Sequence, residues 1–361
     1  MKALSIYAGP QARQRLSQHG LSAADVGVIP AAAGGPKGLI LGPLDRFIFN
    51  EWLPTSQQAI DLVGASIGAW RMATACMPDS QAGLLRLEKD YIYQHYKLRP
   101  GEKFPSAQQV SDSFRENLDI FYGGNIESLL THSRYRLHVI TSRGKGLLKR
   151  EHSVLSPLGY GAAFLSNFIH RKAMGALLER VVFSSSGVLP FGTQDYPTRH
   201  LSLTPDNFMD VLQASCAIPF VLKSVHDIAG APSGAYWDGG ITDYHLHLDW
   251  KTSVAPFKQS RLVLYPHFQK SVVPGWLDKR LKWRHKATSF LDNTVVLAPN
   301  PEWVKTLPNG KLPDRQDFST YGQDLQSRVK VWQAAVSASE QMADEFSAWL
   351  RQPQMSEVQD L

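Results

Sequence analysis

Cysteine is scarce in this sequence, and long apolar runs are missing. Only two of the 361 residues are cysteine, Cys76 and Cys216, and both lie in apolar, helix-like stretches. We therefore expect two buried thiols rather than a disulfide framework, and a cytoplasmic location. No stretch approaches the roughly 18 uninterrupted apolar residues of a membrane-spanning helix. The first residues also lack the long apolar region of a secretory signal.

Internal repeats and low-complexity segments are missing too, as are zinc-finger spacings and RNA-binding signatures. The formal net charge of +6 favours anionic partners, either nucleic acid or an acidic membrane surface. Because no nucleic-acid-binding motif is present, we do not expect nucleic acid as a partner. The apolar fraction of 43% is ample for the core of one large domain or two modest ones.

Strand-like and helix-like segments alternate near the beginning of the chain. Strands are expected over residues 26–30 and 59–63, and each is followed by a helix-like run, over residues 39–50 and 69–76. This βαβα order predicts an α/β fold with a parallel sheet that is covered by helices.

The remainder of the chain adds helices and further strands. Residues 81–133 have helical patterns and no strand signal, so we expect a helical insertion over one end of the sheet. Residues 159–178 are expected to form a packed helix, because several polar and charged residues interrupt the apolar run. A long periodic helix is expected over residues 321–350.

The most informative motif is Gly64–Gly68 (GASIG), which lies between the second strand and the helix after it. A sharp strand-to-helix turn strains the residue at its corner, and Gly64 and Gly68 remove side chains that would clash there. The hydroxyl of Ser66 is then raised above the sheet edge, beside the positive end of the helix. A nucleophile is suited to this position, because developing negative charge is stabilised there. A motif this short also arises by chance, so other segments have to support the interpretation.

A glycine-rich loop, Gly34–Gly38 (GGPKG), follows the first strand. Its backbone can approach a ligand closely, and its amide groups near a helix start can form an anion-binding concavity. Because the loop ends a neighbouring strand, it can face Ser66 and supply an oxyanion hole. It matches neither a P-loop nor a dinucleotide-binding motif, and its plainer interpretation is a tight loop that packs a helix on the sheet.

Two further segments complete the set of motifs. Ala214–Pro219 (ASCAIP) ends a helix-like run, and Asp238–Gly240 (DGG) makes a sharp turn that exposes a carboxylate. Taken alone, the second segment is typical of an ordinary turn.

These four motifs, in this order, resemble those of the patatin-like phospholipases, over about residues 25–250. The resemblance implies a three-layer α/β/α fold with a mostly parallel central sheet, and a Ser-Asp dyad instead of a triad. We accordingly divide the chain into a catalytic domain over residues 1–250 and a C-terminal extension over residues 251–361. The extension is expected to pack on the catalytic domain and to end in a long helix.

The resemblance also implies roles for single residues. Ser66 would be the nucleophile, and Asp238 would be the base that activates it directly. Backbone amides around Gly34, Gly35 and Gly38 would form the oxyanion hole. Lys37 stands where the family carries Arg or Lys, and it would hold the loop or favour an anionic headgroup. The remaining motif glycines, which would shape the turns, are Gly64, Gly68, Gly239 and Gly240. This chemistry requires neither a metal nor a cofactor.

The sequence departs from the family pattern at two places, and the second departure points to a divergent subfamily of the bacterial type. Ala31–Ala33 occupies the stretch where the family often has an acidic residue, which bears on the loop geometry. Ile241–His245 replaces the Asn-x-Pro stretch that often follows Asp-Gly-Gly, which leaves the substrate open.

Two histidines keep alternatives open. His245 and His247 follow Asp238 in the chain, so either one can complete a Ser-Asp-His triad. Together with Asp243 or Asp249 they can also form a metal site. The plainer interpretation is an alternating segment with one buried face.

Trp276–Lys286 (WLDKRLKWRHK) interleaves cations with aromatic and aliphatic residues. We expect a basic amphipathic helix that docks on anionic membranes, or else a solvated helix whose tryptophans pack on the core.

The sequence as a whole, with the resemblance above, predicts a metal-independent lipid acyl hydrolase of the phospholipase A or lysophospholipase type. An acyltransferase, in which an alcohol or lysolipid replaces water, is the alternative from a different class.

Overall fold

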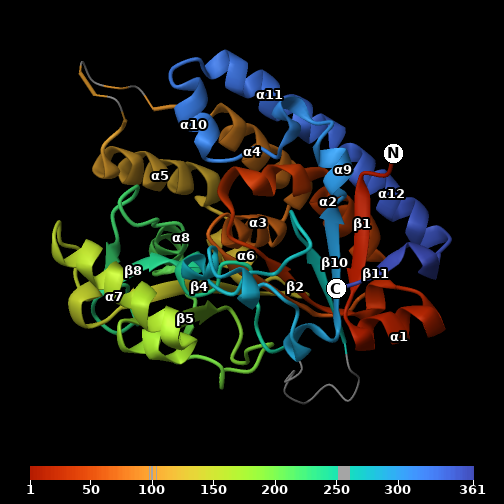
Figure 1. Ribbon diagram of the computed structural model, residues 1–361, viewed down its shortest axis with the longest axis horizontal. Helices are drawn as coiled ribbons and strands as arrows, with labels where there is room; N and C mark the ends of the chain where they lie inside the picture. The colour runs from red at the N-terminus through yellow and green to blue at the C-terminus, as the bar shows by residue number, and fades with distance from the viewer. Residues whose placement is uncertain (97, 99–100, 103, 251–260) are drawn as a thin grey trace.

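A mixed, mostly parallel sheet forms the middle layer of the molecule, and helices cover both of its faces (Figure 1). The computed structural model describes residues 1–361 except 97, 99–100, 103 and 251–260. The strand order is β11-β1-β10-β9-β2-β3-β4-β5-β6, with β8 beside β4 and β7 beside β8. The three-layer α/β/α fold predicted from the sequence is confirmed.

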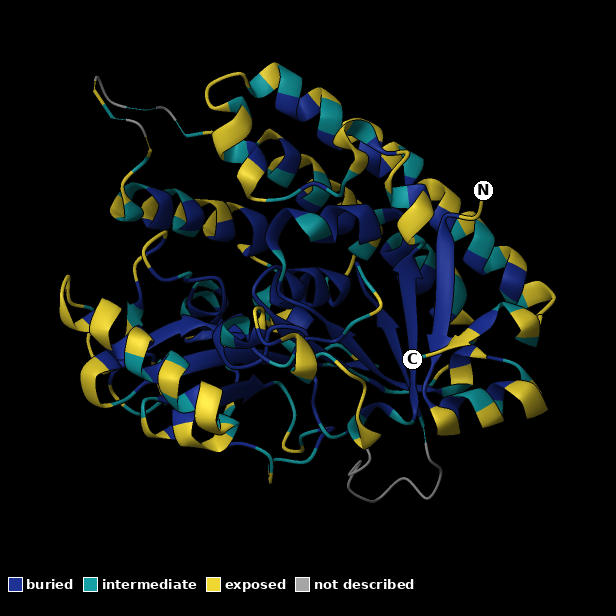
Figure 2. Cartoon of the chain, viewed as in Figure 1, coloured by how far each residue is buried: buried dark blue, intermediate teal, exposed yellow. Residues whose placement is uncertain are grey.

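The central strands are rich in apolar and β-branched residues and are buried on both faces, as is typical of parallel strands under helices (Figure 2). The strands are β1 (Leu4–Ala8), β2 (Val26–Ala31), β3 (Ile60–Ala65), β4 (Tyr135–Gly144), β5 (Leu178–Ser184), β6 (Thr198–Ser202), β7 (Val225–His226), β8 (Ala235–Asp238), β9 (Leu262–Pro266), β10 (Thr294–Pro299) and β11 (Val358–Asp360).

Most helices bury one apolar stripe against this sheet or against another helix. The α-helices are α1 (Pro10–His19), α2 (Gly42–Phe47), α3 (Ile67–Ala75), α4 (Ser80–Tyr93), α5 (Ala107–Tyr122), α6 (Ile126–Leu130), α7 (Leu155–Ile169), α8 (Phe208–Ser215), α9 (Pro301–Val304), α10 (Gln316–Tyr321), α11 (Leu325–Ala338) and α12 (Glu340–Arg351). Helices α4 to α6 fill the segment predicted as a helical insertion, whose described residues contain no strand.

The C-terminal third of the chain is part of the same sheet. Strand β9 pairs with β2, and β10 pairs with β1, so strands from the two ends of the chain alternate across the sheet. The carboxylate of Glu345 on α12 accepts hydrogen bonds from the backbone amides of Ala3 and Leu4. The predicted boundary between residues 250 and 251 borders the segment 251–260, outside the described residues, and the division into two domains stays a prediction.

The single long helix expected over residues 321–350 is wrong. Helix α10 ends at Tyr321 and is capped by Gly322, which has a φ of 53°, and two separate helices follow, α11 and α12. Helix α11 ends at Ala338. The amide of the next residue, Ser339, donates hydrogen bonds to the carbonyls of Ala335 and Val336, and its hydroxyl donates one to the carbonyl of Val336. These local bonds tighten the last turn and compete with continuation of the helix.

The pairing around β4 brings two strand ends together. Strand β3 pairs with residues 135–140 of β4, and the antiparallel β8 pairs with residues 141–143 of the same strand. Because β5 pairs with residues 138–144 and covers the opposite edge, β3 and β8 lie on one side of β4. They run in opposite directions, so their carboxyl ends meet, and the residues at those ends are Ser66 and Asp238.

Candidate active site

Ser66 occupies a strained corner between β3 and α3. Its φ of 56° lies in the left-handed region, which residues other than glycine seldom adopt. Its hydroxyl Oγ donates a hydrogen bond of 2.7 Å to Oδ2 of Asp238. Ser66 precedes the first turn of α3, so its side chain lies at the positive end of the helix dipole. The strand-turn-helix corner predicted from the sequence is therefore present.

The two glycines of this corner allow α3 to approach the sheet closely. A Cβ on Gly64 would lie 2.4 Å from Cα of Ala69, and one on Gly68 would lie 1.9 Å from the carbonyl oxygen of Ala31 on β2. Neither distance is compatible with a side chain, since both neighbours are backbone atoms. The glycine pattern thus sets the depth at which the turn holds Ser66.

Asp238 is fixed by its own turn. Its Oδ1 accepts a hydrogen bond of 2.7 Å from the backbone amide of Gly240, and its carbonyl accepts one from the hydroxyl of Ser142. A Cβ on Gly239 would lie 2.1 Å from the carbonyl oxygen of Ile140, so the turn packs tightly on β4. Burial raises the pKa of Asp238, while Arg315 and the hydrogen bond from Ser66 oppose this rise.

The role of the Ala214–Pro219 motif was not visible in the sequence. The hydroxyl of Ser215 accepts a hydrogen bond of 3.0 Å from the backbone amide of Ser66 and donates one of 2.7 Å to the carbonyl of Ile140. Ser215 is fully buried at the end of α8. It therefore ties the strained corner to β4 and acts as a positioning residue for Ser66.

The glycine-rich loop begins a short 3-10 helix, η2 (Gly35–Leu41), directly after β2. Gly34 caps this helix, and Gly35 has a φ of 59°, so both lie where helix amides have no intrahelical acceptor. Gly38 lies one turn further, where a Cβ would contact Ile67 at 3.5 Å. The structure thus places Gly34 and Gly35 at a helix start and Gly38 against α3, while their role as an oxyanion hole stays a prediction.

A cavity of about 250 Å³ has Asp238 and Gly34 in its wall. Ser66 itself is only 3% exposed. Three cations also line this cavity: Lys37, Lys279 and Arg315. Among the described residues, it holds a single carboxylate besides Asp238, that of Asp314.

The three cations come from separate parts of the chain. Lys37 lies in the glycine-rich loop with its ammonium group 5.5 Å from the ring centre of Phe268, and burial lowers its pKa. Lys279 lies 4.3 Å from the ring centre of Tyr244. Burial, and then the charges of Arg315 and Lys37, lower its pKa to about 8. From the sequence, Lys37 was singled out as part of the glycine-rich loop and Lys279 only as part of the basic segment Trp276–Lys286, while Arg315 belongs to no motif.

In the part of the chain that the structure describes, no hydrogen bond joins His245 or His247 to the Ser66–Asp238 pair. The Nδ1 of His245 lies 3.0 Å from the amide of Val273, and the Nε2 of His247 lies 2.9 Å from the hydroxyl of Thr288. Burial lowers the pKa of His247 to about 4 and holds the pKa of His245 well below its ordinary value. Both rings are therefore neutral at pH 7, and the geometry favours the dyad over the triad.

The metal-site alternative depends on carboxylates that already have partners. Asp243 is fully buried and accepts hydrogen bonds from Arg180 and Arg171. In the part of the chain that the structure describes, no group of three or more His, Cys, Asp or Glu residues could hold a metal ion.

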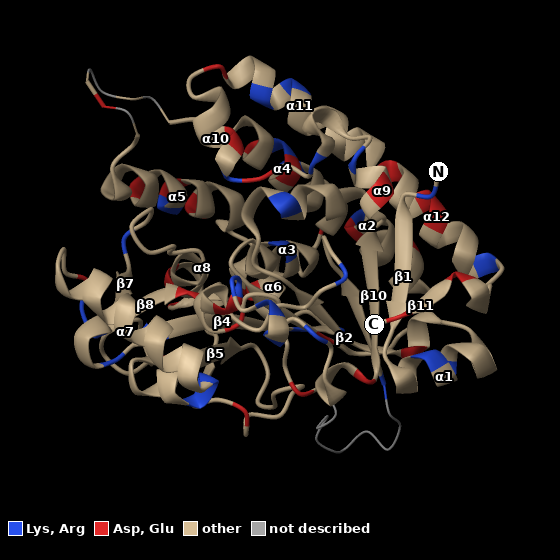
Figure 3. Cartoon of the chain, viewed as in Figure 1, with Lys and Arg blue, Asp and Glu red and all other residues tan. Residues whose placement is uncertain are grey.

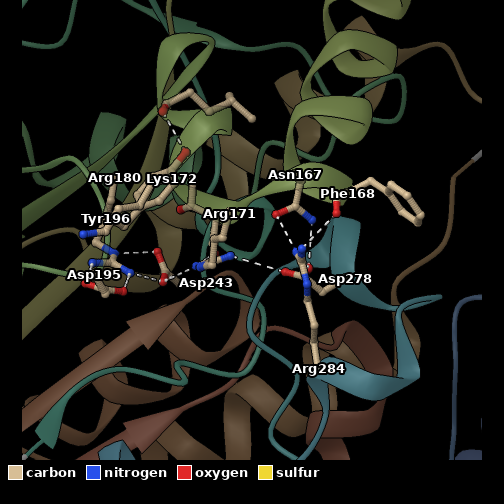
Figure 4. Close-up of polar contacts among 12 residues, drawn as sticks. Asn167, Phe168, Arg171, Lys172, Arg180, Asp195, Tyr196, Asp243, Asp278 and Arg284 are labelled. Atoms are coloured by element: carbon tan, nitrogen blue, oxygen red, sulfur yellow. Dashed lines mark hydrogen bonds and ion pairs between the residues drawn. The ribbon is translucent and has the colours of Figure 1, made fainter.

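The basic segment Trp276–Lys286 is not the amphipathic helix that was expected. It forms two short 3-10 turns, η9 (Trp276–Asp278) and η10 (Lys282–Arg284). Arg284 is held by the buried carboxylate of Asp278 at 2.9 Å, and Asn167 on α7 bonds to the same carboxylate at 2.8 Å (Figure 4). A buried ion pair and the short spacing of the turns thus override the helical pattern.

This carboxylate belongs to a longer chain of buried polar contacts. Asp278 also pairs with Arg171, which reaches Asp243, and Asp243 in turn pairs with Arg180 on β5 (Figure 4). Arg180 completes the chain with a pair to Asp195 at 3.0 Å. The network connects the turns η9 and η10 to α7 and to the loop that follows Asp238.

Comparison with known proteins adds little to this geometry. No model of a known protein family matches the chain, and no curated protein matches it. Among solved structures, VipD from Legionella pneumophila is similar to this chain, with a TM-score of 0.34 and 13% sequence identity. That similarity covers 95% of this chain and 70% of VipD. No helix among the described residues is long and apolar enough to cross a membrane.

Proposed function

We propose that this protein hydrolyses carboxylic esters of lipids through the dyad of Ser66 and Asp238. The observation that carries the proposal is the 2.7 Å hydrogen bond from Ser66 Oγ to Asp238 Oδ2 at a strained strand-to-helix corner. A hydroxyl bonded to a buried carboxylate at a helix start is the arrangement that an activated nucleophile needs. The four motifs shared with the patatin-like phospholipases support the same assignment.

The first half of the reaction would form an acyl-enzyme. Ser66 Oγ attacks the ester carbonyl carbon while its proton passes to Asp238 Oδ2. The resulting oxyanion would be stabilised by the amides of Gly34 and Gly35 and by the positive end of α3. The intermediate then collapses with cleavage of the ester C–O bond, and the proton on Asp238 passes to the leaving alcohol.

Hydrolysis of the acyl-enzyme would complete the reaction. A water molecule attacks the acyl carbonyl while Asp238 accepts its proton, and the bond to Ser66 Oγ then breaks. Asp238 returns this proton to Ser66, which restores the dyad and releases the fatty acid. A buried carboxylate is a stronger base than an exposed one, since burial raises its pKa.

The cavity favours an ester that carries a negative charge. Lys37, Lys279 and Arg315 line the same small cavity as Asp238. An anionic group beside the ester would therefore lie near three cations, each from a different segment of the chain. Ile218, Ile241 and Trp276 supply apolar wall for hydrocarbon. An anionic lipid ester such as a phospholipid or lysophospholipid combines both features.

Labelling with a fluorophosphonate tests this proposal directly. The reagent should react with Ser66, identified by peptide mapping, and Ser66→Ala should remove the label. Asp238→Asn should lower ester hydrolysis by at least about 100-fold, because general-base catalysis contributes that much or more.

The matched control is Ser17→Ala, since Ser17 is an exposed serine on α1 that is remote from the site. It should be labelled like the wild type. Equal labelling of Ser66→Ala would refute the assignment, and loss of hydrolysis in His245→Ala but not in Asp238→Asn would favour the triad instead.

A further inference from the structure

Helix α7 presents an apolar stripe to solvent. Its outward residues are Leu155, Leu158, Ala162, Leu165 and Ile169, which follow one another at intervals of three and four residues. The exposed fractions are 59% for Leu158, 65% for Leu165 and 81% for Ile169. Figure 2 shows much of the outer side of this helix in the colour of exposed residues. Surface helices normally place polar residues on their solvent-facing side. The stripe faces solvent, so it does not help to pack the helix on the protein.

The opposite face of α7 already holds the helix in place. Gly159, Tyr160, Ala163 and Asn167 are buried, and Asn167 belongs to the ion network of Figure 4. Helix α7 contains no charged residue, and its ribbon carries neither charge colour in Figure 3. The packed helix predicted over residues 159–178 extends only to Ile169, because Arg171–Ala176 forms the 3-10 turn η6 and β5 begins at Leu178. One face of α7 packs as predicted, while the other face is apolar and uncovered in the structure.

Neighbouring elements enlarge this surface. The ring of Phe168 at the end of α7 packs edge-on against Trp283 of η10 at 6.0 Å, and the two are 53% and 59% exposed. Phe220 lies 5.9 Å from Tyr160 and is 63% exposed. Its φ of 69° is strained for a bulky residue, and strain of this kind concentrates at functional positions. We use the name α7 face for the exposed residues Leu155, Leu158, Leu165, Phe168, Ile169, Phe220 and Trp283.

Cations flank the α7 face, and acidic residues are missing from its sequence segments. Residues 152–178 and 279–291 contain no Asp or Glu, and Glu151, which precedes the first of these segments, is paired with Lys223. Exposed basic residues precede α7, follow it, and lie in the turns beside Trp283; they are Lys149, Arg150, Lys172, Arg280, Lys282 and Lys286. An apolar face with a basic border is complementary to an anionic membrane surface, where aromatic rings enter the headgroup region and Lys and Arg contact acidic lipids.

The α7 face adjoins the cavity of the candidate site at Phe220. Phe220 directly follows Pro219, which lines the cavity. Trp276 also lines the cavity, and it packs against the cluster that contains Tyr160 and Ala163 of α7. A lipid surface that covers Phe220 therefore lies beside the wall of the cavity, and the buried side of α7 packs on Trp276 of that wall.

We infer that the α7 face docks on anionic lipid bilayers, with α7 lying in the plane of the interface. The stripe from Leu155 to Ile169 is about 21 Å long, from the rise per residue of an α-helix. Only the purpose of docking, which is to bring the cavity to its substrate, rests on the proposed function. A symmetric pair of chains on this face would bring the same cations of both copies together, which disfavours a dimer as the occupant.

Vesicle flotation of the Ser66→Ala protein measures docking independently of catalysis. It should bind vesicles of phosphatidylcholine mixed with phosphatidylglycerol more tightly than vesicles of phosphatidylcholine alone. The double variant Leu165→Asp, Ile169→Asp should bind about tenfold more weakly or worse, because two inserted apolar side chains become charged. Lys172→Glu with Lys282→Glu should weaken binding to the anionic vesicles only.

The matched control is Ile120→Asp, since Ile120 on α5 is 68% exposed and lies outside the α7 face. It should bind like the Ser66→Ala parent, and melting temperatures should show that all variants are folded. Equal loss in the control, or unchanged binding of the Leu165→Asp, Ile169→Asp variant, would overturn the inference. The inference would also be overturned if the parent protein were a dimer that does not bind vesicles and if the Leu165→Asp, Ile169→Asp variant were a monomer. Failure of Ser66 labelling would instead overturn the proposed function and leave the docking result intact.

Discussion

At the scale of single residues, Asp238 combines two properties that oppose each other. Its carboxylate is buried, which raises its pKa, yet it must be ionised to accept the proton of Ser66. Hydrogen bonds from Ser66 and Gly240 and the nearby charge of Arg315 reduce the cost of ionisation. The same burial that makes Asp238 a useful base therefore makes it unfavourable for the stability of the folded chain at neutral pH.

This opposition predicts a characteristic pH dependence. Ester hydrolysis should rise with pH through a midpoint above 3.8, the ordinary pKa of aspartate, because only the carboxylate accepts the proton. The folded protein holds the Asp238 proton more tightly than the unfolded chain, so the contribution of Asp238 to stability falls as the pH rises past 3.8. Asp238→Asn should thus melt at a higher temperature than the wild type at pH 7.

Thermal melts of both proteins across the acidic range check this prediction. The stability difference corresponds to about 1.4 kcal/mol for each unit by which the pKa is raised, and it should shrink as the pH is lowered towards 3.8. A destabilised Asp238→Asn protein at pH 7 would contradict it.

At the scale of elements, the corner between β3 and α3 depends on close packing without side chains. Gly68 lets the first turn of α3 lie against the carbonyl of Ala31 on β2, and Ser215 holds the Ser66 amide from the other side. A change in either contact moves Ser66 relative to Asp238. The loss of geometry should therefore appear in activity as well as in stability.

Gly68→Ala should destabilise the protein by about 1–3 kcal/mol or more, because a Cβ at 1.9 Å from a backbone oxygen forces α3 away from the sheet. Denaturant unfolding measures the change. The matched control is Gly161→Ala in α7, where a Cβ meets nothing within 4 Å. This exposed helix position should gain roughly 0.5–1 kcal/mol, because alanine favours the helix over glycine. Equal effects at the two positions would show that α3 can shift without cost.

At the scale of the whole molecule, the C-terminal part of the chain completes both the sheet and the cavity. Strands β9 and β10 pair with β2 and β1, and Arg315 reaches the glycine-rich loop, where its Nε would lie 3.0 Å from a Cβ on Gly35. Lys279 reaches the same cavity from the turns that the buried ion network fixes. The cations of the site thus depend on the global arrangement of the chain.

Arg315→Ala should raise the KM for anionic lipid esters about tenfold or more, because a hydrogen bond to a charged group contributes about 1.5–3 kcal/mol. The KM for a neutral ester of the same chain length should change little. Arg351→Ala, which removes a cation on α12 outside the cavity, serves as the control. Equal changes in KM for the charged and the neutral ester would show that Arg315 does not select for charge.

The sequence by itself determined the α/β class and the strand-turn-helix corner, because both depend on local patterns. Apolar runs followed by helical periodicity define β3 and α3, and the glycines at positions 64 and 68 mark a sharp turn between them. The pairing of Ser66 with Asp238, which lie 172 residues apart, came from the resemblance of four motifs to those of the patatin-like phospholipases. The motifs indicated the two residues, but they did not indicate how far apart the two side chains lie.

Only the tertiary structure decided what surrounds this pair. Arg315 carries no local signal, and the local pattern around Lys279 indicated a surface helix and not a cavity wall, since the place of both residues follows from the way β9 and β10 enter the sheet. Local periodicity predicted a helix for Trp276–Lys286, but the buried carboxylate of Asp278 draws Arg284 inward and leaves two short turns. The α7 face was likewise hidden, because a helix that is apolar on both sides looks the same in sequence whether one face or both are covered.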